Sequence, residues 1–132
     1  MNRLKCMHGW SAAVGAMDGL TGLLLILVPG FVLGLLGIPD LSDDTLVFVS
    51  WIGVFVAGVG MSYGFAFGSR RAGEAVWKST AMIRLLVFVF LTIQVVAGRM
   101  PVAWMGVACT DGFVAAVQIA VLRAGWWKEV RG

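Results

Sequence analysis

The chain has 132 residues, of which 60% are hydrophobic and 13% are charged, with a formal net charge of +3 at pH 7. A soluble domain usually carries about 25% charged residues, and a chain this short cannot hide so much apolar surface from water. The composition excludes an ordinary water-soluble fold, and because the positive residues flank apolar stretches it gives no sign of nucleic-acid binding.

Four apolar stretches are each long enough to cross the hydrocarbon core, which takes about 20 helical residues. The first covers about residues 11–28 with Asp18 as its only charge, and Pro29-Gly30 then breaks or kinks the helix. Residues 31–38 are apolar but too few for a span, so we expect a short helix along the interface. The other spans cover about residues 45–69, 78–98 and 102–122. We predict an all-α, integral membrane four-helix bundle that forms one domain over residues 1–132.

Basic residues are distributed unequally between the two ends of these spans. Cytoplasmic loops of membrane proteins are enriched in Lys and Arg, so we predict that both termini lie in the cytoplasm. The predicted cytoplasmic side carries Arg3, Lys5, Arg70, Arg71, Lys78, Arg123, Lys128 and Arg131, and the other side carries Arg99 with Asp40, Asp43 and Asp44.

The tryptophans follow the same pattern, because Trp is enriched at both membrane–water interfaces. Trp126 and Trp127, with Lys128 and Arg131, are expected to anchor the C-terminus on the inner leaflet. The tryptophans near cytoplasmic ends of spans are Trp10, Trp77, Trp126 and Trp127, and those near outer ends are Trp51 and Trp104.

Glycines recur at three- and four-residue spacing in the first two spans. Helices in lipid associate through small residues that allow their backbones to approach closely. We predict that the two glycine stripes face neighbouring helices within the chain, and the same motif would also suit the seam of a homodimer. The stripes are Gly15, Gly19 and Gly22 in the first span and Gly53, Gly60, Gly64 and Gly68 in the second.

A small polar set interrupts the spans. The rise of about 1.5 Å per residue places Asp18, Tyr63 and Arg84 at one level, about 9–10 Å from the cytoplasmic interface, and Asp111 deeper, at about 18 Å. Thr80 shares the helix face of Arg84, and Gln118 shares that of Asp111. The full set of candidate site residues is Asp18, Tyr63, Thr80, Arg84, Asp111 and Gln118.

An unpaired Arg or Asp at mid-membrane costs at least about 2.5–3.5 kcal/mol, so these charges are expected to pair. We favour a pair between Arg84 and Asp18, with Asp111 as the alternative partner of Arg84. One arginine does not neutralise both carboxylates, so the deeper Asp111 is expected to hold a proton. Two roles stay open for the set. It is either a clamp that fixes helix register or a polar pocket for a head group, a quinone-like molecule or a proton.

The sequence contains no recognisable catalytic or metal site. His8 is the sole histidine and lies in the N-terminal tail, and Cys6 and Cys109 are far apart without a C-x-x-C motif. No phosphate-binding glycine loop ending in Gly-Lys-Ser/Thr is present. We therefore expect no cofactor, no metal and no enzymatic activity.

Several short motifs give the chain a recognisable layout. The first span ends in Leu-Val-Pro-Gly, a short apolar piece leads to Gly37-Ile38-Pro39, and three spans with short loops follow. Together with residues 51–53, 60–63 and Thr110-Asp111-Gly112, this layout resembles the DoxX-like group of small four-helix bacterial membrane proteins over about residues 10–123. The resemblance implies the fold but no uniform activity, although some members are linked to oxidoreductase complexes.

We expect a non-enzymatic inner-membrane protein that binds a lipid-like or quinone-like molecule or serves as an accessory subunit of a membrane complex. Its expected partners are membrane lipids and either a second copy of the chain or a larger complex. The alternative is a small proton-coupled transporter that uses Asp18 or Asp111. Small multidrug-resistance transporters also have an acid in their first span, but their weak Lys/Arg bias differs from the strong bias of this chain.

Overall fold

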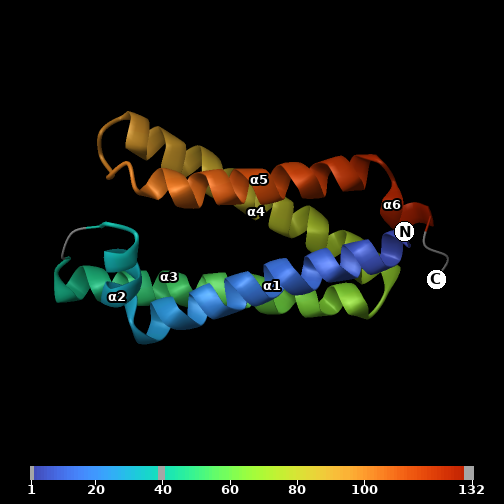
Figure 1. Ribbon diagram of the computed structural model, residues 1–132, viewed down its shortest axis with the longest axis horizontal. Coiled ribbons are helices and arrows are strands. Elements are labelled where there is room, and N and C mark those ends of the chain that lie inside the picture. Colours follow the sequence, from blue (N-terminus) through green and yellow to red (C-terminus); the bar gives the residue numbers. More distant parts are fainter. Residues whose placement is uncertain (1, 39–40, 130–132) are drawn as a thin grey trace.

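The computed structural model describes residues 2–38 and 41–129 (Figure 1). Two charges that enter the orientation prediction, Asp40 and Arg131, lie outside the described residues. Every regular element in the described part is helical. In chain order the elements are α1 (Arg3–Leu27), α2 (Pro29–Leu35), α3 (Asp43–Ser62), the 3₁₀ helix η1 (Tyr63–Phe67), α4 (Arg70–Val96), α5 (Trp104–Arg123) and α6 (Trp126–Glu129).

Four helical segments are long and apolar enough to cross a membrane: Arg3–Leu27, Asp43–Phe67, Arg70–Val96 and Trp104–Arg123. This confirms the prediction of an all-α protein with four candidate spans. Large apolar side chains are exposed along these helices, for example Leu20 on α1, Phe48 on α3 and Phe90 on α4. Such extensive apolar exposure is what a protein surrounded by lipid requires, since water would not tolerate it.

The helices begin earlier than the apolar stretches alone indicate. The side chain of Asn2 accepts a hydrogen bond from the Leu4 amide and caps α1, so the predicted N-terminal tail is helical from Arg3. Ser69 caps α4 in the same way, through the Ala72 amide, and the helix starts well before the predicted span. Helices therefore extend into the charged segments, because a helix needs a cap and good hydrogen bonding but not an apolar composition.

Two helix pairs form the body of the molecule. α1 packs along α3, α4 packs along α5, and η1 contacts both α1 and α4. Figure 1 shows these pairs, with the N-terminus and α6 at the same end of the molecule. At the opposite end, Trp104 at the start of α5 packs against a small cluster of Leu33, Ile38 and Val49 from α2, its flank and α3.

Glycines bring α1 and α3 into backbone contact. A Cβ added at Gly22 would lie 2.3 Å from the Ala57 nitrogen, and one at Gly60 would lie 2.4 Å from the Gly19 nitrogen. Gly15 and Gly53 are equally restricted, by Tyr63 Cβ at 2.9 Å and by the Gly22 carbonyl oxygen at 2.8 Å. The α1–α3 contact is therefore too close for any side chain at these four positions.

Gly64 and Gly68 lie outside this contact, although they continue the spacing of the stripe. Both are exposed, and a Cβ at Gly64 would meet no atom within 4 Å. The chain changes from α-helix to 3₁₀ helix at Tyr63, and a 3₁₀ helix has three residues per turn instead of 3.6. That change rotates Gly64 and Gly68 away from α1.

Trp77 and Trp127 are buried in the core, with 1% and 2% of their surfaces exposed. Their rings meet edge to face at 5.6 Å, and Trp77 Nε1 donates a hydrogen bond to Ser11 Oγ at 2.9 Å. Both rings therefore face the protein core rather than lipid. Trp127 does not anchor the C-terminus on lipid. Instead its ring occupies the space that Gly73 leaves on α4, where an added Cβ would approach the ring to 2.3 Å.

Charged groups at the same end hold α6 against α1. Arg3 forms an ion pair with Glu129, and its guanidinium lies over the Trp126 ring at 5.4 Å from the centroid. The Arg3 and Glu129 side chains are about half exposed, so this pair adds little stability by itself. The seating of the Trp127 ring on Gly73 is therefore the main attachment of α6.

Gly73→Ala is expected to release α6, because the methyl group needs the space that the rigid Trp127 ring occupies. Trypsin in detergent solution should then cleave after Arg123 and Lys128 about tenfold faster than in the unchanged protein. Gly106→Ala is the matched control, since a Cβ there meets nothing within 4 Å. Equal cleavage rates for Gly73→Ala and Gly106→Ala would contradict this attachment.

Candidate functional site

The candidate polar residues lie on buried or partly buried helix faces. On α1, Ser11 and Asp18 belong to the same buried stripe as Met7, Val14 and Gly22, spaced three or four residues apart. The stripe faces inward because its other members are apolar or small and pack in the core. Asp18 is thereby held inside the protein, with 6% of its surface exposed.

Arg84 lies between two aspartates and bonds to both. Its Nη2 donates to Asp18 Oδ2, and its Nη1 donates to Asp111 Oδ1 at 2.5 Å. The three side chains come from α4, α1 and α5, and only 5%, 9% and 17% of the Arg84, Asp18 and Asp111 side chains are exposed. Arg84 therefore connects the α1–α3 pair to the α4–α5 pair through its ion pair with Asp18, while its ion pair with Asp111 joins α4 to α5.

The sequence favoured Asp18 as the partner of Arg84 and kept Asp111 as an alternative, whereas the structure has both contacts at once. A guanidinium presents N–H groups on two terminal nitrogens, so it can serve two acceptors from different helices. The cluster still holds two carboxyl groups against one guanidinium. It carries a net negative charge unless one carboxyl group is protonated.

The three charged residues lie at one level, and Asp111 is not deeper than Arg84. Counted along the helices, Arg84 is about 21 Å from Arg70, Asp18 about 22 Å from Arg3, and Asp111 about 18 Å from Arg123. α6 contacts α1, α4 and α5, so these helix ends gather at one end of the molecule. The predicted difference in depth between Asp111 and the other two residues arose because depth was counted from the ends of the apolar stretches. The helices themselves extend beyond those stretches.

A second polar chain lies one to two turns closer to that end. Tyr63 OH donates to Gln118 Oε1 at 3.3 Å, and Gln118 Nε2 donates to Thr80 Oγ1 at 3.1 Å. Thr80 Oγ1 in turn donates to the Val76 carbonyl at 2.7 Å. Tyr63, Thr80 and Gln118 are each at most 2% exposed. This chain links η1, α4 and α5, and its Tyr63 adjoins Arg84.

The structure thus brings together all six candidate site residues in two adjacent bonded groups. Sequence reasoning missed Ser11, which is fully buried and accepts from Trp77. A signal was present, because Ser11 lies seven residues before Asp18 and so on the same helix face. Gly73 was also missed, since its role depends on a ring that arrives from the far end of the chain.

The chemistry of the cluster is electrostatic rather than nucleophilic. Within residues 2–38 and 41–129, no group of three or more His, Cys, Asp or Glu is placed to hold a metal ion. Cys6 and Cys109 are free and exposed. Among the residues that the structure describes, the buried polar groups of the site bond to one another, except that Arg84 Nε has no hydrogen-bond partner.

No protein-family model, curated protein or solved structure matches this chain.

Proposed function

We propose that this chain is a non-enzymatic, multi-pass protein of the bacterial inner membrane that acts as an accessory subunit of a larger membrane complex. One observation carries the proposal: Arg84 is already bonded to both Asp18 and Asp111. Thr80, Gln118 and Tyr63 are likewise bonded to one another. A pocket for a quinone or a head group needs polar groups that face open space. Here they face each other, which favours a clamp.

The clamp has a clear physical task. Helices in lipid gain little from burying apolar area against each other, because the tails are equally apolar. The α1–α3 and α4–α5 pairs therefore need specific contacts to choose their relative position. The buried ion pair between Arg84 and Asp18 fixes that position, and the ion pair with Asp111 holds Arg84 against α5. Any slip would leave an unpaired charge in a low-dielectric interior.

The outer surface is then the part of the molecule that meets partners. α1 exposes a row of small residues, spaced three or four apart, on the side opposite its buried stripe. Such a row lets a helix of another protein approach closely, as the α1–α3 glycines do within this chain. The row consists of Gly9, Ala12, Ala13 and Ala16.

Affinity purification in a mild detergent, with mass spectrometry of co-purifying proteins and lipids, tests the proposal. We expect one membrane protein in stoichiometric amount, and we expect Ala12→Leu/Ala16→Leu to reduce its recovery at least about tenfold by blocking close approach. Ala116→Leu, which adds one of these side chains on the exposed face of α5, is the control. Recovery of the chain alone, or equal recovery of the partner with all variants, would refute the accessory-subunit role.

The proposal includes both termini in the cytoplasm. It rests on the excess of Lys and Arg at that end, where Arg3, Arg70 and Lys128 lie, and on the layout that resembles the DoxX-like group. A cysteine introduced at position 42 should react with an impermeant thiol reagent from outside, and one at position 72 only from inside. The reverse pattern would overturn this orientation.

A proton-coupled carrier is the second candidate, and the surplus carboxyl group favours it. Asp111 is the most exposed member of the charged cluster, with 17% of its side chain accessible. A carrier predicts that Asp111→Asn abolishes proton-driven uptake in proteoliposomes while the protein still folds. Purified protein that moves no protons in either form would remove this candidate.

A further inference from the structure

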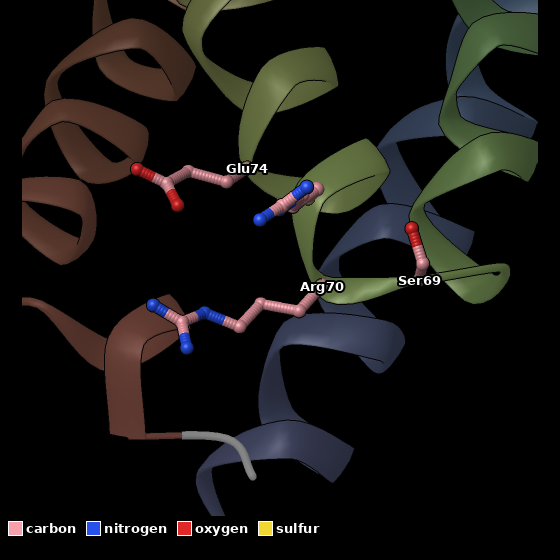
Figure 2. A pocket seen from close by; sticks show the side chains of 4 residues that line it. Ser69, Arg70 and Glu74 are labelled. Atoms are coloured by element: carbon pink, nitrogen blue, oxygen red, sulfur yellow. The ribbon is translucent and has the colours of Figure 1, made fainter. Parts of the chain in front are cut away.

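We propose that a hollow at the start of α4 binds the phosphate-bearing headgroup of an anionic phospholipid. The hollow has a volume of about 460 Å³ and is lined by Ser69, Arg70, Arg71 and Glu74 (Figure 2). It lies away from Arg84, so this site is separate from the proposed subunit role, but it rests on the proposed orientation, with the start of α4 at the cytoplasmic surface.

Two arginines give the hollow its charge. Neither Arg70 nor Arg71 has a carboxylate within ion-pair distance among the residues that the structure describes. Figure 2 shows Arg70 and Glu74 extending from the same side of α4, with the C-terminal helices beyond them. An arginine fork matches the oxygens of a phosphate and donates two N–H bonds at once, which favours a phosphate over a simple halide ion.

Glu74 is the one acidic residue that lines the hollow, and its carboxylate is already paired with a cation. Its Oε1 lies 2.7 Å from Lys78 Nζ, one turn along α4. Arg70 and Lys128 also lie close enough to act on the carboxylate. The lining and its immediate neighbours therefore carry more positive than negative charge, which leaves the hollow attractive to an anion.

The length of α4 places the hollow near the depth expected for lipid phosphates. α4 has 27 residues and is about 40 Å long, whereas the hydrocarbon core is about 30 Å thick. The charged residues of α4 other than Arg84 are confined to its first turns, Arg70 to Lys78, and beyond them Met82 and Leu86 are more than half exposed. Roughly the first 10 Å of α4 should therefore project into the headgroup layer.

That position distinguishes a lipid from a free phosphate ion. An acyl chain can run along exposed apolar side chains such as Met82 while its headgroup reaches Arg70 and Arg71. Anionic headgroups are also abundant at the cytoplasmic surface of membranes, where each nearby Lys or Arg adds to the attraction. Both the apolar surface and the charge thus match an anionic phospholipid.

Native mass spectrometry of the full chain in a neutral detergent, titrated with phosphatidylglycerol or phosphatidylcholine, tests the site. We expect one tightly bound phosphatidylglycerol and much weaker phosphatidylcholine. Arg70→Gln/Arg71→Gln should weaken phosphatidylglycerol binding at least about tenfold. The matched control, Lys5→Gln/Arg123→Gln, removes two exposed cations from the same end and should weaken it less than about threefold.

Equal losses for the two double variants would overturn the site, because the attraction would then be a general surface effect. Inorganic phosphate that displaces the lipid at millimolar concentration would show that the ligand is a free ion, and this too would overturn the lipid assignment. Glu74→Gln provides an independent test that keeps both arginines. It removes the only acid of the lining and should tighten phosphatidylglycerol binding about two- to fivefold, and no change or a loss would count against the site.

Discussion

Replacing Arg84 with methionine is expected to destabilise the protein by about 3–5 kcal/mol, a large share of the stability of a small protein. The change leaves Asp18 and Asp111 buried without their shared partner. Methionine fills much of the volume of the arginine stem, so the loss reports charge rather than packing. The free energy of unfolding in mixed micelles, measured against the fraction of a denaturing detergent, gives the magnitude.

Rescue by removal of the acids shows which partners matter. Because both carboxylates bond to Arg84, Asp18→Leu/Arg84→Met should recover only part of the loss, and adding Asp111→Leu should recover most of the remainder. Arg123→Met is the control, since Arg123 is exposed on the last turn of α5 and its loss should cost less than about 0.5 kcal/mol. An Arg84→Met protein as stable as the control would show that the clamp contributes nothing.

Gly22→Ala and Gly60→Ala are expected to have the next largest effects. Each should destabilise the protein by about 1–3 kcal/mol, with values near the upper end of that range. The added methyl groups would lie within 2.4 Å of backbone atoms on the facing helix, and backbone atoms cannot rotate aside as a side chain can. The change is informative because alanine is the better helix former, so helix propensity alone would favour both variants.

Two glycines of the same stripes serve as controls. Gly19→Ala and Gly64→Ala place the new methyl group where nothing lies within 4 Å. They should be neutral or slightly stabilising in the same detergent unfolding measurement. If all four variants behaved alike, close contact between α1 and α3 would not be what holds this pair together.

The sequence was sufficient for the number of candidate spans and for the six candidate site residues that the structure brings together. Four long apolar stretches and a handful of interior polar residues are strong signals, because each polar group inside lipid needs a partner. Asp18, Arg84 and Asp111 could be chosen on that ground alone. Their simultaneous contact could not be predicted, since it depends on where α4 and α5 begin and end, and the start of α4 is set by a polar cap, Ser69, outside the apolar stretch.

Other features depend on contacts between distant segments, which spacing does not reveal. Trp127 resembles an interfacial anchor in the sequence, and only the empty position at Gly73 on α4 turns it into a core residue. Gly64 continues the α-helical spacing of the glycine stripe, but the chain changes to a 3₁₀ helix at Tyr63. In both cases the residue spacing is present in the sequence, but tertiary packing determines whether the residue lies in a contact or on the surface.

The central claim is that the Arg84 guanidinium bonds to two carboxylates from different helices inside the proposed membrane bundle. Solid-state NMR on the protein in lipid bilayers, with ¹⁵N-labelled arginine and ¹³C-labelled aspartate carboxyl groups, measures this directly. We predict dipolar coupling from the Arg84 terminal nitrogens to the carboxyl carbons of both Asp18 and Asp111, at separations within about 4 Å. Coupling to neither carboxyl group would contradict the clamp and the function built on it.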